Sequence, residues 1–468
     1  MKIIERISLI TLTTLLCMSC SNYLDIKPYG RTIPKTAEEF SALIHTQLNT
    51  IDAGTDAYMI GNASQWMTWD AQCGDDFETC LTGSGGKSIG IYVGTIVSKS
   101  SENYYRSLYQ TIRDCNIVIN EMQEDNTTDF GIIRATAHAI RGVCYYQLLR
   151  LFCEVPQRGN LNGQQGVPLV MTFDMEERPI RSTMQETIDL IEDDFKKAIS
   201  YHPSEDIYRF TEDVIKGYQA RLYFWTKQWS KALPIAQELL NKYPLLEGAA
   251  YQKMMTTAYD LAGNQLIKAY RAADTSGENA LSSANSLLQH RPVSQRLLSL
   301  FTEEEKTTDI RYELWVNNKR VAKKTFFCGM RTAEFKLMEA ECYYHSGEKV
   351  KALRSINDLR AHRIANYVDL TENTLPALSE KEIIITDAEG NALTPLMGTI
   401  LSERRKELFL EGDRFFELKR NGSPEFWTAY NGQKYTTKKY MYTFPIPAHD
   451  ILLVDGLQQN EGYTEISY

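Results

Sequence analysis

The sequence predicts an all-α protein, mostly helical, in which helix pairs are joined by long irregular loops. Three observations lead to this expectation. Apolar residues recur three and four positions apart over several long stretches, two stretches repeat one helix-pair pattern, and the glycine-rich segments between them lack a helical period. Of the 468 residues, 43% are hydrophobic and 24% are charged, which is ordinary for a globular protein with a substantial core.

The chain begins with the pattern of a bacterial lipoprotein signal. A positively charged start precedes an apolar stretch, residues 7–16, which is shorter than the roughly 20 residues of a membrane-spanning helix. The small Ser19 then precedes Cys20, as is typical of a thiol that receives lipid. We expect residues 1–19 to be a signal peptide and residues 20–30 to be a tether that carries lipid, palmitate included, on Cys20. The alternative is a secreted protein with an incidental cysteine.

Three long helices are predicted in the first half of the chain. Apolar residues spaced three and four apart run over residues 104–122 and again over residues 132–152. Thr183 opens a third helix, because Thr183 and Glu186 have the spacing of a capping box. Pro203 closes that helix, since proline cannot continue it.

Two later stretches share the spacing of a tetratricopeptide helix pair. Three positions of the first stretch recur at the same offsets in the second: Ala220, Tyr223 and Ala232, then Ala340, Tyr343 and Ala352. Small residues let the two helices of a pair approach closely, and the tyrosine fills the groove between them. We expect interrupted repeats rather than a continuous array; the alternative is two generic helix hairpins.

Three segments are predicted to be loops: residues 54–100, 249–292 and 369–394. The first contains eight glycines and has little helical period. Long structured loops on a helical scaffold are where binding residues tend to lie. Candidate binding residues are therefore sought first in such loops, and Trp315 lies in a further stretch predicted to be non-helical.

The cysteines indicate core positions rather than a disulfide framework. Seven cysteines remain apart from Cys17 and Cys20, and an odd number cannot pair completely. Cys115, Cys144 and Cys342 fall in helical patterns as small core residues. Cys73 and Cys80 flank a short loop and could pair with each other.

Charge and motif spacing exclude several classes of function. The net charge of −9 argues against nucleic acid, which needs a basic face. No cysteine or histidine spacing indicates zinc. The acidic residues Asp70, Asp75, Asp76 and Glu78 lack the alternating spacing of an EF-hand loop, so we expect a solvated acidic loop rather than a calcium site.

Four stretches carry recognisable motifs, in an order that spans nearly the whole mature chain. They are Tyr23-Leu24-Asp25-Ile26-Lys27-Pro28; Arg141-Gly142 through Phe152 with Val155-Pro156-Gln157; Glu403 to Arg420; and Pro445-Ile446-Pro447 with Gln459-Asn460 and Gly462-Tyr463. Together they resemble the SusD/RagB family of outer-membrane lipoproteins. The resemblance implies a helical fold with four tetratricopeptide-like units. We expect one domain over residues 31–468, with an N-terminal part to about residue 205 and a C-terminal part from about residue 206.

The resemblance also implies a function. Family members sit at the cell exterior, bind nutrient and cover a SusC-like TonB-dependent transporter as a lid. Most known ligands of the family are glycans, so capture of oligosaccharides is the expected function. The RagB branch handles peptides, and peptide capture is the alternative. Neither oligosaccharide capture nor peptide capture involves catalysis or an organic cofactor.

Two other classes of function, an enzyme and a protein-binding adaptor, fit the sequence less well. An enzyme such as a surface glycoside hydrolase would use paired carboxylates, but no G-x-S-x-G, HExxH or P-loop pattern is present. A plain tetratricopeptide adaptor would explain the repeats but neither the lipid anchor nor the closing motif.

The charged run near the C-terminus is predicted to stabilise the fold. Glu403, Glu407 and Glu411 lie at i, i+4 spacing on one helix face and need cationic partners. The motif residues proposed for this ion network are Arg404, Arg405, Glu407, Glu411, Gly412 and Arg414, in which the arginines supply the positive charges. The alternative is a contact with ligand or transporter.

A sugar site needs flat apolar faces for the pyranose ring and polar groups for its hydroxyls. Aromatic residues in loops are therefore better candidates than those in helices. The proposed ligand-binding residues are Asn62, Trp66, Trp69, Asp70, Tyr92 and Trp315. The alternative for Trp66 and Trp69 is that they pin their loop onto the scaffold. Trp225 and Trp229 lie in the first helix pair and are expected to be packing residues.

Overall fold

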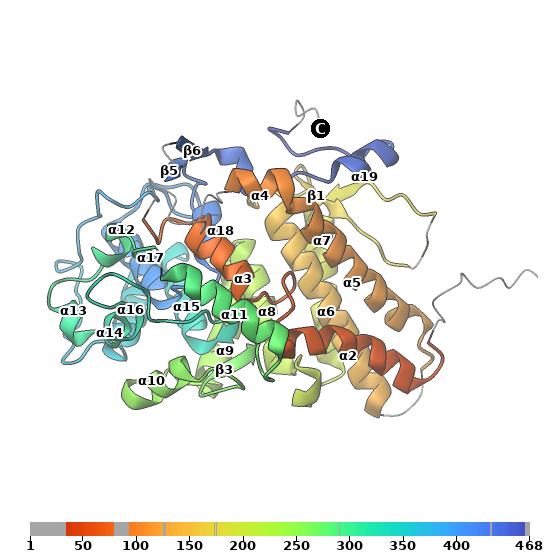
Figure 1. The fold of residues 1–468 in the computed structure, drawn as a ribbon, viewed down its shortest axis with the longest axis horizontal. Coiled ribbons are helices and arrows are strands. Elements are labelled where there is room, and N and C mark those ends of the chain that lie inside the picture. The colour runs from red at the N-terminus through yellow and green to blue at the C-terminus, as the bar shows by residue number, and fades with distance from the viewer. Residues whose placement is uncertain are drawn as a thin grey trace, which may run out of the picture.

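The computed structural model describes residues 34–78, 93–124, 128–172, 174, 176–289, 291–430 and 433–463. Helices dominate these residues, and the strands form three separate two-stranded antiparallel sheets (Figure 1). The mostly helical fold is confirmed. Among the described helices, none is long and apolar enough to cross a membrane. The expected signal peptide and tether, with Cys20 and the opening motif, lie outside the described residues.

The elements follow one another along the chain with the bounds below. Up to residue 242 they are α2 (Ala37–Ala53), α3 (Ala63–Trp66), η1 (Met67–Gln72), α4 (Val93–Lys99), α5 (Ser101–Glu121), α6 (Thr128–Phe152), β1 (Gln165–Pro168), β2 (Arg181–Thr183), α7 (Met184–Ser200), η2 (Asp206–Tyr208), α8 (Glu212–Trp225) and α9 (Trp229–Lys242). Beyond it they are α10 (Gly248–Thr256), β3 (Gln265–Lys268), α11 (Thr275–Leu288), α12 (Gln295–Leu298), α13 (Glu305–Thr308), α14 (Ile310–Trp315), β4 (Gly329–Arg331), α15 (Thr332–His345), α16 (Lys349–Ala361), α17 (Pro395–Glu407), α18 (Arg414–Arg420), β5 (Phe426–Tyr430), β6 (Gln433–Thr437), η3 (Lys439–Tyr442) and α19 (Ala448–Leu453).

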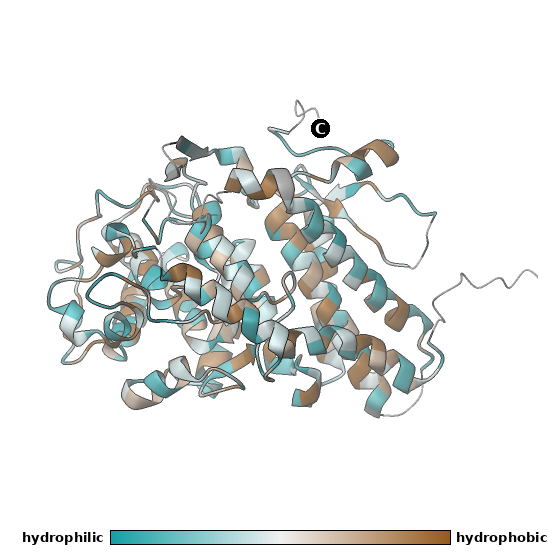
Figure 2. Ribbon diagram, viewed as in Figure 1, coloured by the Kyte–Doolittle hydropathy of each residue, from teal (hydrophilic) through white to brown (hydrophobic). Residues whose placement is uncertain are grey.

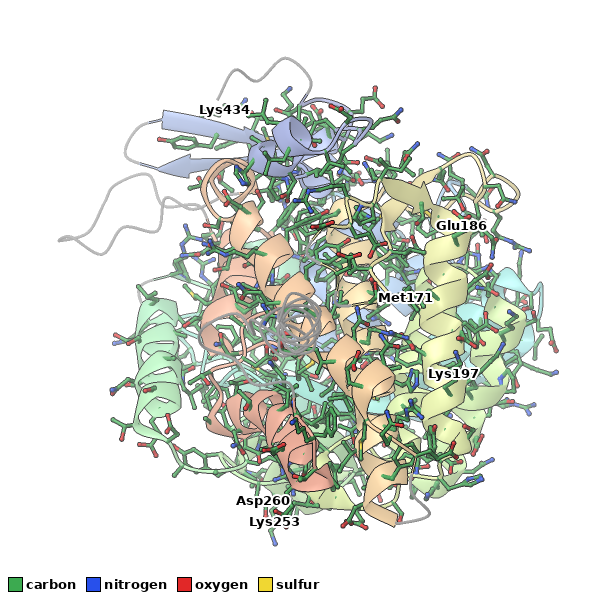
Figure 3. The ribbon with its side chains drawn as sticks, turned by 90° about the vertical axis from the view of Figure 1, so that its right-hand side faces the viewer. Met171, Glu186, Lys197, Lys253, Asp260 and Lys434 are labelled. Carbon is green, nitrogen blue, oxygen red and sulfur yellow. The ribbon has the colours of Figure 1, made fainter. Side chains whose placement is uncertain are left out.

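The three long helices predicted in the first half are α5, α6 and α7, which pack side by side. α6 is buried on nearly every side, whereas hydrophobic and hydrophilic residues are interleaved along α5 (Figure 2). The predicted capping box at the start of α7 is present, because Thr183 and Glu186 each bind the backbone of the other. Glu186 and Lys197 lie near opposite ends of α7 (Figure 3), where their charges complement the helix dipole.

The Arg141-Gly142 motif joins α6 to α7. A Cβ atom at Gly142 would lie 2.7 Å from Cε1 of Phe195, so only glycine allows the two helices to approach this closely. Beside it, Arg141 donates from Nε and Nη2 to both carboxylate oxygens of Asp194, at 2.9 and 2.7 Å, in a fully buried pair. The motif is therefore a packing device.

The two predicted helix pairs are α8 with α9 and α15 with α16. The four small residues of the repeat pattern, Ala220, Ala232, Ala340 and Ala352, are all fully buried. Although the pairs lie far apart in the sequence, α9 packs directly against α15. The repeats therefore form one contiguous stack in space.

Two of the predicted loops hold helices, so those expectations were wrong. Residues 54–100 contain α3, the π-helical turn η1 and α4, and residues 249–292 contain most of α10 and all of α11. The start signals are local: the side chains of Asn62 and Asp274 accept hydrogen bonds from the first backbone N–H groups of α3 and α11. Residues 369–394 are described throughout and carry no helix.

The charged run is two helices, not the single helix expected. α17 ends at Glu407 and α18 begins at Arg414, and between them Leu410 and Gly412 have left-handed backbones with φ of 59° and 75°. A Cβ atom at Gly412 would lie 2.6 Å from Trp66. The turn therefore needs glycine both for its backbone angle and for the indole that covers it.

The expected pairing of Glu403, Glu407 and Glu411 with the arginines of the motif was also wrong. The three glutamates pair with other cations: Glu403 with Arg311, Arg360 and Lys406; Glu407 with Arg331 and Arg363; Glu411 with Arg331 and Lys324. The arginines of the motif pair with aspartates instead, Arg404 with Asp413, Arg405 with Asp76 and Arg414 with Asp75. Adjacent helical residues point in different directions, so the two sets reach different neighbours.

The closing motif fastens the C-terminal segment to the core. The amide of Gln459 bonds to both backbone groups of Ile446, at 2.7 and 2.8 Å. Asn460 donates to the carbonyl of Phe152 at the end of α6 and accepts from Arg181 of β2, at 2.9 and 2.6 Å. These amides satisfy buried backbone groups, which explains their place in the motif.

Cys115, Cys144 and Cys342 are buried free thiols, as predicted. Cys73 is also buried, whereas Cys80 lies outside the described residues, so their pairing stays an untested expectation.

Candidate functional site

The aromatic residues proposed as a sugar platform lie in the core. Trp66, Trp69 and Trp315 are 8%, 1% and 2% exposed, and Trp315 ends helix α14 rather than lying in a loop. The indole of Trp69 packs against the rings of Phe415 and Phe444, at centroid distances of 4.7 and 5.6 Å. Protein therefore covers their ring faces, and Trp66 and Trp69 anchor the 62–73 segment to the core.

The polar candidates of the same segment are engaged in the fold. Asn62 caps α3 by accepting from the backbone N–H of Gln65 at 3.0 Å. Asp70 is buried and accepts from the backbone N–H of Gly412 at 2.7 Å, and burial raises the pKa of this carboxyl well above its usual value. Tyr92 lies outside the described residues.

Three of the four acidic residues, Asp70, Asp75 and Asp76, are buried, contrary to expectation, whereas the Glu78 side chain is 37% exposed. Asp75 and Asp76 are 4% and 1% exposed, because Arg414 and Arg405 draw them into the interior. No cluster of described residues could hold a metal ion. Asp75 and Asp76 thus serve as partners for the arginines of the charged motif.

An open groove of about 490 Å³ lies where segments far apart in the sequence meet. Its walls come from residues 74–78, 294–296, 380–383 and 426–428. Trp427 lines this groove with 51% of its surface exposed. The chain has six tryptophans, all of them described, and the other five are buried. Trp427 is the one that offers its surface to a solute.

The β5–β6 hairpin positions Trp427. Side chains alternate across a strand, so Phe426 faces the core at 7% exposure while Trp427 points outward. Across the hairpin Trp427 is paired with Thr436, and Nζ of Lys434 lies 5.2 Å from the centre of its ring. Lys434 is labelled on this hairpin at the upper edge of the molecule in Figure 3.

The opposite wall is held by backbone and side-chain bonds. Phe77 forms an isolated antiparallel bridge with Val293. The carboxylate of Glu78 accepts from the backbone N–H of Gln295 and from Nη1 of Arg320, both at 2.9 Å. The wall is therefore built before any ligand arrives.

Charged groups lie along the floor and rim. Glu382 accepts hydrogen bonds from Arg405 and Arg414 at 2.9 and 2.8 Å. Burial works to raise the pKa of Glu382, but these two guanidinium groups hold that pKa well below its usual value. Arg296 is partly exposed on the rim, 3.7 Å from Asp75. The groove thus combines an aromatic face with ionised acceptors and donors, as recognition of a hydroxyl-rich ligand requires.

Trp427 was missed in the sequence, although local signals existed. Residues 426–430 read Phe-Trp-Thr-Ala-Tyr, a strand-like run, and Asn431-Gly432 after it is a strong hairpin signal. A tryptophan at the outward position of a short hairpin is a candidate for exposure. No local signal identifies the wall opposite, which forms by contacts across more than 200 residues.

Two family models match the chain. Residues 299–463 match the model described as the SusD family, and residues 22–224 match the model described as starch-binding and associating with the outer membrane. No curated protein sequence matched the chain.

Solved structures share the fold at low sequence identity. A SusD-like carbohydrate-binding protein from Bacteroides vulgatus ATCC 8482 is 19% identical, with 91% of this chain and 98% of that chain covered and a TM-score of 0.68. Surface glycan-binding protein A from Bacteroides fluxus is 16% identical, with 92% and 100% covered and a TM-score of 0.63. A laminarin-binding SusD-like protein is 16% identical, with 91% and 99% covered and a TM-score of 0.58.

The helix-pair scaffold defines a helical protein built on tetratricopeptide-like units. The two matched models, the motifs they contain and the shared fold identify it further. The chain belongs to the SusD/RagB family.

Proposed function

We propose that this chain captures oligosaccharides at the cell surface and delivers them to a SusC-like TonB-dependent transporter in the outer membrane. The main support for glycan capture is the exposed Trp427 in a groove lined by charged groups. The C–H face of a pyranose ring stacks on an indole, and carboxylates and ammonium groups bond to its hydroxyls. The names of the glycan-binding and laminarin-binding relatives support the same function.

We also propose that lipid on Cys20 anchors the protein and that the protein binds its ligand without catalysis. Lipid on Cys20 would hold the described fold, which begins at residue 34, on the outer face of the outer membrane through a short tether. The groove would bind its ligand and release it unchanged. A Cys20→Ser variant is expected to leave the membrane fraction, and retention there would contradict lipid anchoring at this thiol.

The experiment is a calorimetric binding screen of the chain from residue 21, which retains every described element, against panels of oligosaccharides and peptides. Trp427→Ala is then measured on any hit. We expect a glycan hit whose affinity falls about tenfold or more in the variant, since it loses the stacking face. The melting temperature should not change, because the side chain is half exposed.

Two control variants test whether the loss of affinity is specific to the Trp427 groove. Val368→Ala removes another exposed apolar side chain, 81% exposed, and should leave affinity unchanged. Trp427→Phe should retain part of the affinity. Hits among peptides alone would replace glycan capture by peptide capture, and release of a shortened product from any oligosaccharide would contradict a purely binding role.

A further inference from the structure

An open pocket lies beside the turns of the two helix pairs. Its volume is about 440 Å³, and its walls come from residues 158–161, residues 226–231 between α8 and α9, residues 345–346 at the end of α15, and Gln185 of α7. This volume is within the range of small-molecule sites, roughly 300–1,000 Å³. The pocket shares no residue with the Trp427 groove, so it is a separate candidate site.

A lysine in the wall of this pocket, Lys227, is buried but has no partner for its charge. The residue is 8% exposed, and its Nζ atom forms no ion pair or hydrogen bond within the described part of the chain. Protein does not cover this Nζ atom completely, so an acceptor in the pocket can reach it. Burial lowers the pKa of Lys227, and an anionic ligand would offset that loss of hydration.

The carboxylates near Lys227 are bound to other groups. None of the described residues that line the pocket is acidic. Asp387 and Glu389 act on Lys227 from behind the wall, but Asp387 accepts from two backbone N–H groups of its own turn, both at 2.9 Å. Glu389 accepts from Nε1 of Trp229 at 2.8 Å and from Nη1 of Arg158 at 3.3 Å. The ammonium group of Lys227 is therefore free to bind an anion that enters the pocket.

The backbone of Lys227 indicates that its side chain is not there for the turn. Lys227 follows Ala220 at the same spacing as Gly347 follows Ala340 in the second helix pair. Both residues have left-handed backbones, with φ of 59° and 82°. Glycine adopts this conformation freely, whereas a residue with a Cβ atom is strained in it. Strained residues of this kind cluster at ligand sites, and here a lysine stands where glycine would fit better.

The rest of the wall suits a ligand that carries hydroxyl groups beside its negative charge. Ser230 and Ser346 are exposed, and their hydroxyls make no hydrogen bond with the described residues. Arg158 lies at the rim with a side chain that is 61% exposed, and the fork of a guanidinium group matches a carboxylate. A carboxylate on a polyhydroxylated ring would use all of these groups.

We propose that this pocket binds an acidic sugar unit, with the carboxylate of the sugar on Nζ of Lys227 and its hydroxyls on Ser230 and Ser346. The choice of a sugar rests on the proposed function, whereas the anionic character of the ligand rests on Lys227 alone. The pocket thus extends the ligands of this chain from neutral to acidic sugars.

The test compares D-glucuronate with D-glucose by calorimetry on the chain from residue 21, because the two sugars differ only at C6. We expect glucuronate to bind at least about tenfold more tightly. Lys227→Gly should lower the affinity for glucuronate by about tenfold or more, through loss of a charged hydrogen bond. Its melting temperature should stay the same or rise, because glycine relieves the left-handed backbone. Equal affinities for the two sugars, or unchanged glucuronate binding in Lys227→Gly, would overturn the proposal.

Two further variants show whether the effect belongs to this pocket. Lys242→Ala removes a lysine with a 58% exposed side chain at the far end of α9 and should leave glucuronate binding unchanged. Trp427→Ala should also leave it unchanged, so failure of this pocket and failure of the Trp427 groove are distinguishable. A crystal soaked in glucuronate should show the carboxylate beside Lys227. Glucuronate found only elsewhere, or inorganic sulfate at Lys227 in crystals that exclude glucuronate, would contradict an acidic sugar as the ligand.

Discussion

Arg405 of α17 donates from Nε to Oδ1 of Asp76 at 2.7 Å, although 329 positions separate the two residues in the chain. Both side chains are 1% exposed. The same guanidinium bonds to Glu382 at 2.9 Å, which lines the Trp427 groove. The charged motif near the C-terminus therefore fixes Glu382 in the wall of the groove.

Arg405→Ala is expected to destabilise the fold by about 3–5 kcal/mol, because it leaves the buried carboxylates of Asp75 and Asp76 with fewer cationic partners. Urea unfolding measures the loss. Lys197→Ala, which breaks a half-exposed pair with Asp193, should change stability by less than about 1 kcal/mol. An unchanged melting temperature together with lost ligand binding would mean that Arg405 acts on the ligand instead.

Gly412→Ala should destabilise by about 2–5 kcal/mol, since it places a Cβ atom in a left-handed backbone and against the indole of Trp66. Gly390→Ala is the matched control: its φ is 83°, but a Cβ atom there meets nothing within 4 Å, so only the backbone term of about 1–2 kcal/mol applies. Equal losses in the two variants would show that the Trp66 contact contributes nothing.

Trp69→Ala and Trp427→Ala should behave in opposite ways. Removal of the buried Trp69 is expected to cost about 3–5 kcal/mol of stability through the cavity it leaves, whereas Trp427→Ala should leave the unfolding transition in place. Differential scanning calorimetry compares them. A stable Trp69→Ala variant with weakened ligand binding would show that Trp69 belongs to the ligand site.

Stability should fall in acid partly through Glu341. Burial works to raise the pKa of this carboxyl, but Arg420 and His345 outweigh it and hold the folded-state pKa at about 2. The unfolded chain has a value of about 4.3, so the stabilisation is complete above that pH and is lost as pH falls from about 4.3 towards 2. Glu341→Gln should flatten this part of the profile in urea unfolding, while Glu303→Gln, at a 90% exposed side chain, should not.

The helices of the scaffold could be predicted because their signals are local. The apolar spacing of α5 and α6 and the capping box of Thr183 and Glu186 act within a few residues of each other. The family motifs could be recognised for the same reason. Their roles could not, since Arg141, Gly142 and Asn460 act through partners on other elements.

The sequence by itself determined the helical class, the helix pairs and the family of this protein. Only the tertiary structure decided which tryptophan reaches solvent and which carboxylate each arginine meets. Trp69 is buried because Phe415 and Phe444 close over it from more than 300 positions away, and Trp427 is exposed because its hairpin ends at the molecular surface. Burial and ion pairing depend on neighbours in space, which no local pattern specifies.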